Sequence, residues 1–288
     1  MTTERRLYRI PLRGASVVLG ERTLVMGILN VTPDSLAGGT LGAEEALARG
    51  LRLFEEGADW LDVGGESTRP GAEPVAAAEE LRRVVPVIEA LRRRGCGPLS
   101  VDTTKAEVAA AALDGGADIV NDVSGFGYDP AMAALVARRG VPAVLMHLRG
   151  GPAERHRAPA YADVMGEVKA ELAAALGRAE AAGVARERTL VDPGIGFSKE
   201  AAHSLEALRR LPELAALDRP LLVGPSRKSF IGRVLDLPVE RRLLGTAGAV
   251  AASVMLGAHV VRVHDVREMV EVVRVCDAIR GDAARRAA

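Results

Sequence analysis

Several side-chain types are almost missing from this 288-residue sequence. It contains two asparagines, no glutamine and four lysines against 34 arginines, and aromatic residues make up only 3%. The core must therefore consist mainly of alanine, valine, leucine and isoleucine. The scarce polar side chains are expected only where arginine or glutamate cannot replace them. They gather where apolar runs end, which marks a candidate site: Asn30, Lys105, Asn121, Lys199 and Lys228.

Charge and cysteine content exclude several classes of protein. Basic and acidic residues balance at 38 each, so no electrostatic argument favours a nucleic acid or an anionic membrane as partner. Cys96 and Cys276 lie far apart and match no metal-binding spacing, which predicts free thiols in a cytoplasmic protein. The charged beginning of the chain lacks the apolar run of a signal peptide. The weakly polar stretch 246–261 is too short to span a membrane.

A repeating pattern of short apolar runs and longer helical stretches occupies the rest of the chain. Eight such pairs with continuously apolar strands predict an α/β fold, a (β/α)8 TIM barrel, because its strands are buried on both faces. An open doubly wound sheet is the alternative, but GILNVTPDS lacks the glycine-rich phosphate turn that normally follows its first strand. The predicted strands are 23–29, 58–64, 98–102, 117–123, 142–148, 188–194, 220–226 and 258–265. The predicted helices are 43–56, 74–94, 104–114, 130–139, 161–182, 199–216, 240–256 and 266–281.

The remaining segments complete one predicted domain, residues 1–288. Residues 1–23 predict a short β-hairpin that covers the barrel. A glycine before three of the strands, in Gly57-Ala58, Gly116-Ala117 and Gly257-Ala258, is typical of a left-handed helix cap. The longer connections 30–42, 64–75, 148–160 and 224–239 are candidate mobile loops over a site.

Unusual polar residues follow strand after strand at the end where barrel active sites lie. Asp102, Asn121 and Asp192 combine acceptors with an amide and suit a flat heterocycle that presents N–H and NH2 groups. Lys228, Arg262 and His264 predict an anion site, which barrels often place after strands seven and eight. Asn30, with the nearby hydroxyl of Thr32, is a candidate oxygen ligand for Mg2+. These residues therefore predict a heterocyclic phosphate ester and a metal.

Each of these residues also has a purely structural interpretation. Asp192 before Pro193-Gly194 is also typical of a turn, and Asp265 of a helix cap. His147 is expected to pack or to form local hydrogen bonds, and Lys105 and Lys199 are expected to support the site rather than to bind ligand. The functional interpretation therefore depends on joint placement at the strand ends.

Seven motifs in order resemble the dihydropteroate synthase family. They are GILNVTPDS, DVGGESTRPGA, SVDTTK, NDVSG, DPGIGFSK, PSRKSFIG and RVHDV, and the resemblance covers residues 23–281. It implies a barrel enzyme of folate synthesis that joins 6-hydroxymethyl-7,8-dihydropterin diphosphate to p-aminobenzoate with Mg2+, and that sulfonamides inhibit by competition. It also implies a cytoplasmic homodimer, for which helices 240–256 and 266–281 are candidate interface elements.

The resemblance implies a role for each site residue. Asp102, Asp192 and Lys228 are the expected catalytic residues. The expected pterin ligands are Asp102, Asn121, Met146, Asp192, Gly196 and Lys228. The expected diphosphate ligands are Asn30, Arg262 and His264, with Asn30 also on the metal. The expected p-aminobenzoate pocket contains Thr68, Arg69, Pro70, Phe197, Lys228 and Ser229.

The first loop departs from the family pattern. Leu36 replaces the usual phenylalanine, and Gly38 stands where a second aspartate is usual. In the family, that aspartate is thought to help stabilise a cation. We expect activity to survive through the remaining carboxylates. Two alternatives stay open: a paralogue that binds pterin without catalysis, for which Gly38 is the hint, and a pterin-dependent methyltransferase relative. The methyltransferases lack the combined SRKS and RVHD motifs, which argues against the second alternative.

Overall fold

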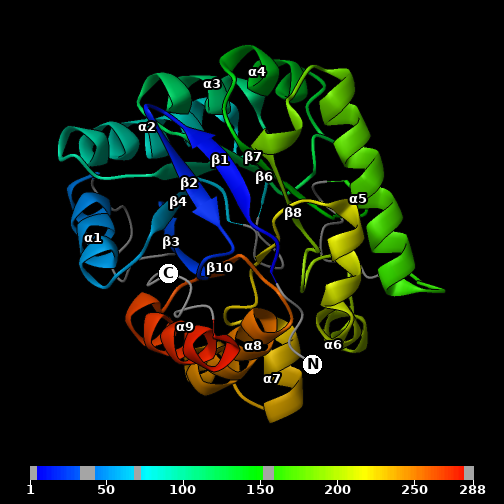
Figure 1. Cartoon of the computed structure of the whole chain (residues 1–288). Helices are drawn as coiled ribbons and strands as arrows, with labels where there is room; N and C mark the ends of the chain where they lie inside the picture. Colours follow the sequence, from blue (N-terminus) through cyan, green and yellow to red (C-terminus); the bar gives the residue numbers. More distant parts are fainter. Residues whose placement is uncertain (1–4, 33–42, 68–72, 152–158, 282–288) are drawn as a thin grey trace.

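The computed structural model describes residues 5–32, 43–67, 73–151 and 159–281, and the predicted barrel is confirmed (Figure 1). Eight parallel strands lie in the order β8-β7-β6-β5-β4-β3-β10-β9. A parallel bridge between Val191 and Leu221 joins β8 to β9 and closes the ring. The strands are β3 (Leu24–Asn30), β4 (Trp60–Gly64), β5 (Leu99–Asp102), β6 (Ile119–Asp122), β7 (Ala143–Met146), β8 (Thr189–Asp192), β9 (Leu222–Val223) and β10 (Val260–Val263).

Helices surround the barrel close to the predicted positions, with two differences. The predicted helix 199–216 is wrong in its second half: α6 ends at Arg209, and Leu211–Leu217 forms a 3₁₀ segment with Pro212 near its start, where an α-helix would need the missing N–H. The predicted loop 224–239 contains a short helix, α7 (Ser229–Leu235). The others are α1 (Ala43–Glu55), α2 (Ala77–Arg93), α3 (Ala106–Asp114), α4 (Ala131–Arg139), α5 (Val164–Ala181), α6 (Ala201–Arg209), α8 (Leu243–Met255) and α9 (Val266–Arg280).

The strands are continuously apolar because both of their faces are buried. In β3, Val25 and Leu29 belong to the large core between strands and helices. Leu24 and Met26 alternate with them and belong to a separate cluster inside the barrel. Among the described residues, no helix is long and apolar enough to cross a membrane.

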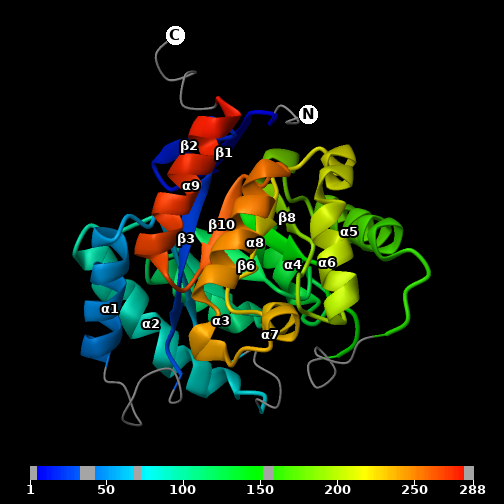
Figure 2. The ribbon, with the colours of Figure 1, turned by 90° about the horizontal axis from the view of Figure 1, so that it is seen from below.

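The predicted hairpin consists of β1 (Tyr8–Leu12) and β2 (Ala15–Leu19), paired antiparallel. Its buried side chains Ile10 and Leu19 pack with Met26 and Trp60 in the barrel interior. The hairpin therefore covers the end of the barrel where the strands begin, and Figure 2 shows it opposite the end that carries α7. The ends of the strands stay available for a site.

The glycines before β4, β6 and β10 adopt the predicted left-handed conformation. The φ angles of Gly57, Gly116 and Gly257 are 102°, 113° and 104°. A residue with a β-carbon is strained at such angles, so glycine allows a helix to end and the chain to turn directly into the next strand.

A buried ion pair anchors the segment before the hairpin to the last helix. Arg5 is 3% exposed, and its Nη2 donates to Asp277 Oδ1 at 2.7 Å. Asp277 also accepts from the Thr23 backbone N–H at 2.8 Å, and Arg5 Nη1 donates to the Ala258 carbonyl at 2.9 Å. The pair therefore joins the segment before the hairpin, the residues before β3 and β10, and α9.

We predict that Asp277→Asn lowers the free energy of unfolding by about 3 kcal/mol, because it leaves the Arg5 guanidinium buried without a counter-charge. Urea denaturation measures the change. The control is Asp114→Asn, which breaks the exposed ion pair with Arg139 at 2.6 Å. It should leave the midpoint of the urea transition unchanged. Equal shifts in the two variants would contradict the prediction.

Candidate active site

The register of the strands brings the predicted polar residues to one level of the barrel. Asn30 pairs with Gly64, Gly64 with Asp102, and Asp102 with Asn121 across four adjacent strands. On the other side, Met146 of β7 pairs with Asp192 of β8. The convergence expected from sequence is therefore present in the structure.

Gly64 keeps a space open between two of these side chains. A β-carbon at Gly64 would lie 3.6 Å from Asp102 Oδ2 and 3.7 Å from Asn30 Oδ1. The described residues contain no group of three or more histidine, cysteine, aspartate or glutamate side chains that could hold a metal. A single amide oxygen beside an open space fits Mg2+, which often takes its remaining ligands from water and substrate phosphates.

The centre of the site contains a carboxylate that sequence reasoning missed. Asp62 of β4 is fully buried, and its Oδ2 accepts from Asn121 Nδ2 at 2.8 Å and from Arg262 Nε at 2.6 Å. Its Oδ1 has no hydrogen-bond partner among the described residues. Asp62 lies inside the apolar run ADWLDVG rather than at its end. The signal that could have found it is a carboxylate within an otherwise apolar strand.

Arg262 links the two parts of the site that the sequence predicted to be separate. Its Nη2 donates to Asp102 Oδ2 at 2.7 Å while its Nε contacts Asp62. Arg262, predicted as an anion ligand, therefore contacts Asp102, predicted as a heterocycle ligand. The physical reason is that two buried carboxylates require a nearby counter-charge.

The buried surroundings of His264 favour the neutral form of its ring. Burial, reinforced by the Arg262 charge, lowers the pKa of His264 to about 3. Its Nδ1 lies 2.9 Å from the Ser226 hydroxyl, which also accepts from the His264 backbone N–H at 3.2 Å. When the Ser226 hydroxyl donates to Nδ1, the ring proton lies on Nε2 and is available to an anionic ligand.

Three charged groups around the mouth titrate near neutral pH. Burial raises the pKa of Asp102 to about 7, with Arg262 opposing the shift, and raises the pKa of Asp192 to about 6. Burial also lowers the pKa of Lys228 to about 7, and the Arg262 charge lowers it further. Such shifts cluster at functional sites. The Asp192 carboxylate is oriented by the Gly194 backbone N–H, which donates to Oδ1 at 2.7 Å.

The remaining predicted ligands lie around Lys228 or outside the described residues. The Lys228 ammonium lies 3.6 Å from the centre of the Phe197 ring, and a β-carbon at Gly196 would lie 2.9 Å from Lys228 Cδ. Met146 packs with Phe197 in a small apolar cluster. Ser229 is exposed at the start of α7. The predictions for Thr68, Arg69, Pro70, Leu36 and Gly38 lie outside the described residues.

The residues predicted to be supports make local contacts. Lys105 Nζ donates to Glu66 and to Glu80, each at 2.6 Å. His147 forms local hydrogen bonds, as predicted, with Glu171 and Lys199. Asp265 precedes α9 as expected, but its side chain makes no cap hydrogen bond and instead accepts from Arg227 Nε at 3.0 Å.

Comparison with known proteins identifies the family to which this site belongs. The family described as "Pterin binding enzyme" matches residues 26–264. A dihydropteroate synthase from Synechocystis sp. is 46% identical over 90% of this chain and 91% of its own length. The chain belongs to the dihydropteroate synthase family.

Solved structures of the dihydropteroate synthase family share this architecture. The enzyme from Xanthomonas albilineans with 4-aminobenzoic acid is 45% identical, covers 96% of this chain and 99% of its own, and gives a TM-score of 0.90. The Yersinia pestis enzyme in a sulfonamide complex is 41% identical, covers 95% and 99%, and also gives a TM-score of 0.90. The barrel and hairpin are therefore those of the family.

We predict that the free energy of unfolding of the parent falls relative to that of Asp192→Asn as pH rises. Burial raises the pKa of Asp192 in the folded protein from its ordinary value of 3.8 to about 6. Stability from this proton is therefore present at acid pH and lost as pH rises through about 6. Between pH 5 and pH 8 the parent should lose on the order of 1 kcal/mol relative to the asparagine variant. Urea denaturation at several pH values measures this, and a difference that does not change with pH contradicts it.

Proposed function

We propose that this chain, as a member of the dihydropteroate synthase family, joins 6-hydroxymethyl-7,8-dihydropterin diphosphate to p-aminobenzoate and releases pyrophosphate and 7,8-dihydropteroate. The observation that carries the proposal is the joint placement of Asn121, Asp192 and Lys228 with Arg262 and His264 at one barrel mouth. This set offers acceptors to a nitrogen-rich ring and cationic or N–H donors to a diphosphate.

The reaction breaks one bond and forms another at the same carbon. The bond between the pterin methylene carbon and the diphosphate oxygen breaks, and its electron pair leaves with pyrophosphate. The aryl amine nitrogen attacks that carbon and then loses a proton. The enzyme must therefore stabilise a departing anion and positive charge on the carbon together, which preorganised charges achieve without a protein nucleophile.

The pterin subsite is proposed to contain Asp102, Asn121, Asp192 and Lys228, with Met146 and Gly196 against the ring. Above pH about 6 the Asp192 carboxylate is ionised and accepts from the ring N–H and NH2 groups. Asn121 is held by Asp62, which leaves its amide oxygen to face the ligand. Buried carboxylates beside the ring favour the positive charge that develops on the methylene carbon.

The diphosphate subsite is proposed to contain Asn30, Arg262 and His264. Arg262 Nη1 makes no hydrogen bond with the described residues and is free to donate to a diphosphate oxygen. His264 would add its neutral Nε2–H. Asn30 Oδ1 would hold Mg2+, which when bound supplies positive charge to the departing diphosphate.

The p-aminobenzoate subsite is proposed to lie beyond Lys228. Phe197 and Ser229 would line it together with Thr68, Arg69 and Pro70, which lie outside the described residues. The Xanthomonas relative was solved with 4-aminobenzoic acid and the Yersinia relative with a sulfonamide drug. We therefore expect sulfonamides to compete with p-aminobenzoate in this chain.

The direct test mixes the protein with the dihydropterin diphosphate, p-aminobenzoate and Mg2+. We expect dihydropteroate and pyrophosphate in equal amounts, and loss of both when a chelator removes the metal. Pterin binding without product would instead identify a non-catalytic paralogue, and methyl transfer would identify a methyltransferase. Gly38→Asp restores the usual first-loop aspartate, and a large gain in turnover would show that this loop is impaired here.

We predict that Asp62→Asn lowers kcat/KM for the dihydropterin diphosphate by about 10-fold to 100-fold, because the charged hydrogen bonds that orient Arg262 and Asn121 are lost. Steady-state kinetics measure the change. The matched control is Asp59→Asn, three residues earlier, where the carboxylate pairs with Arg22 away from the mouth. An Asp62→Asn enzyme as active as the control would remove Asp62 from the site.

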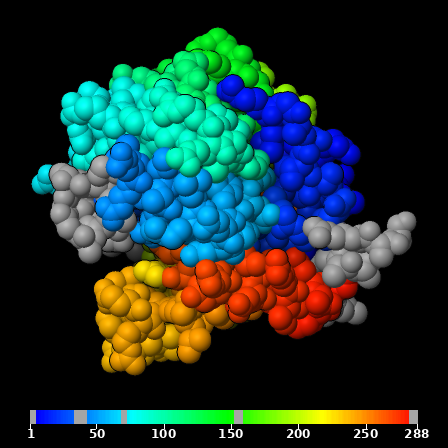
Figure 3. Space-filling view, turned by 90° about the vertical axis from the view of Figure 1, so that its left-hand side faces the viewer, coloured from blue at the N-terminus to red at the C-terminus, as the bar shows by residue number. Residues whose placement is uncertain are grey.

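We also propose that the chain forms a homodimer through helices α7 to α9, which gather on one side of the molecule (Figure 3). This surface carries large apolar side chains that the single chain leaves exposed, and such a patch is typical of a protein interface. They are Val234, Leu235, Val239, Leu244, Val275 and Ile279, with Leu244 83% exposed.

We predict that Leu244→Glu shifts the protein from dimer to monomer, because burying the new carboxylate in an apolar contact is costly. Sedimentation velocity measures the mass of each species. Leu7→Glu is the matched control, because Leu7 is 51% exposed and does not belong to helices α7 to α9. A parent protein that sediments as a monomer, or a Leu244→Glu variant that stays dimeric, contradicts this interface.

A cytoplasmic location is proposed on the chemistry of the two cysteines. Cys96 and Cys276 are both free thiols in the structure. Free thiols persist in reducing compartments, whereas oxidising compartments favour disulfides.

A further inference from the structure

The loop between Asp192 and Lys199 has an unusual backbone that calls for a cause. Three of its residues have positive φ angles: Gly194 at 65°, Gly196 at 79° and Ser198 at 46°. Two are glycines, but serine is strained in this region. Such a conformation persists only where surrounding contacts hold it in place.

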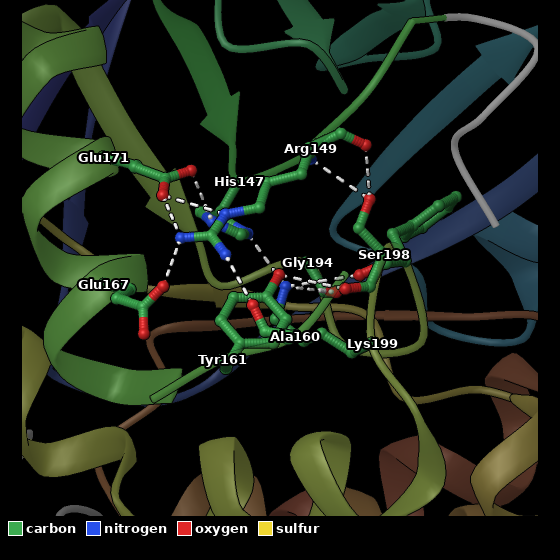
Figure 4. A network of polar contacts seen from close by, with 10 residues as sticks. His147, Arg149, Ala160, Tyr161, Glu167, Glu171, Gly194, Ser198 and Lys199 are labelled. Atoms are coloured by element: carbon green, nitrogen blue, oxygen red, sulfur yellow. Dashed lines mark hydrogen bonds and ion pairs between the residues drawn. The ribbon is translucent and has the colours of Figure 1, made fainter. Parts of the chain in front are cut away.

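The ammonium of Lys199 lies at the centre of this loop (Figure 4). Lys199 is 7% exposed, and its Nζ contacts His147 Nδ1 at 2.8 Å, the Gly194 carbonyl at 3.2 Å and the Phe197 carbonyl at 3.3 Å. An ammonium has three donors, and three acceptors surround it. Two of them belong to the loop itself, so the side chain closes the loop on itself.

His147 connects this centre to α5. Burial lowers the pKa of His147 to about 2, so the ring is neutral and its Nδ1 accepts from the Lys199 ammonium. Its Nε2 then carries the proton and faces Glu171 Oε2 at 3.1 Å. Glu171 also accepts from Arg149 Nε at 2.9 Å.

A second contact fixes the loop at Ser198. The Ser198 hydroxyl donates to the Arg149 carbonyl at 2.7 Å and accepts from the Arg149 backbone N–H at 3.0 Å. The Tyr161 hydroxyl donates to the Ser198 carbonyl at 2.9 Å. Arg149 and Tyr161 therefore hold the strained Ser198 in place. Lys199 holds the preceding part of the loop through the Gly194 and Phe197 carbonyls.

The loop that Lys199 closes forms the surface on which Lys228 lies. The Phe197 ring lies beneath the Lys228 ammonium, 3.6 Å from its centre, a distance at which a cation is attracted to a ring face. Gly196 passes so close to Lys228 that a β-carbon there would meet its Cδ at 2.9 Å. A rotation of the loop would therefore displace the Lys228 side chain.

We propose that Lys199 is a positioning residue: its ammonium, through the Gly194 and Phe197 carbonyls, holds the Phe197 ring and thereby places Lys228 at the junction of the two substrates. The catalytic consequence rests on the proposed function of Lys228, whereas the structural coupling does not. Arginine is abundant in this chain, but a planar guanidinium does not match three acceptors converging on one point. This explains why a scarce lysine stands here.

Nuclear magnetic resonance of ε-carbon-labelled lysine tests the coupling directly. Only four lysines occur in the sequence, so four signals are expected. Lys228 is assigned with Lys228→Met, and its Cε protons should be shifted upfield by the Phe197 ring. Burial lowers the pKa of Lys199 to about 7. The spectra are therefore recorded near pH 6, below that value, so that Lys199 is protonated.

The variants are Lys199→Met, which keeps the length but removes the donors, and Lys169→Met as the matched control in α5. We expect Lys199→Met to lose most of the upfield shift of Lys228 and Lys169→Met to keep it. Phe197→Leu, which removes the ring, gives the reference position of the Lys228 signal without any upfield shift. If Lys199→Met does not fold, Lys199→Gln supplies fewer donors and should lose part of the shift. An unchanged Lys228 signal in the folded Lys199 variant overturns the proposal.

Kinetics separate this proposal from the proposed function. We expect Lys199→Met to lower kcat/KM for p-aminobenzoate about tenfold or more, with Lys169→Met at the parent rate. A parent protein that makes no dihydropteroate, while Lys199→Met still loses the Lys228 shift, overturns the function and supports the coupling. An active parent whose Lys199→Met variant keeps both rate and shift overturns the coupling alone.

Discussion

The site depends on one guanidinium placed between two buried carboxylates. Arg262 contacts Asp62 and Asp102 at once, and Asp62 also holds the Asn121 amide. Without this positive charge, two carboxylates at the barrel mouth would repel one another in a region with little water. Burial still raises the pKa of Asp102 to about 7, so the charge of Arg262 offsets the effect of burial only partly. Among the described residues Arg262 Nη1 makes no hydrogen bond, and this donor supports the proposed diphosphate subsite.

Ammonium groups also connect segments of the chain at the two supporting lysines. Lys105 joins Glu66, which follows β4, to Glu80 of α2, and Lys199 closes the loop after β8. In each case an ammonium with several donors draws separate segments of chain toward one point. The loops of a barrel carry its chemistry, and these contacts link residues that follow β4 and β5 and residues that follow β7 and β8. The loop after β8 carries Phe197, whose ring centre lies 3.6 Å from the Lys228 ammonium.

Much of the architecture could be predicted because it depends on local pattern. Alternate residues of β3 face the helices and the barrel interior, so a continuously apolar run is enough to predict the strand. A glycine before a strand predicts a positive φ angle, and Gly57, Gly116 and Gly257 adopt one. The errors arose where local pattern is weak. The helix α7 is only seven residues long, and Asp62 lies within an apolar run rather than at its end.

The sequence by itself determined the order of strands and helices, the covering hairpin, and the polar residues that end each strand. Those features follow from periodicity, glycine and chain order, all of which a linear pattern contains. Only the tertiary structure decided which polar groups pair. Arg262 and Asp62 are separated by 200 residues and meet through closure of the barrel. Burial then decided which groups are charged, because the cost of a charge depends on surroundings that distant segments supply.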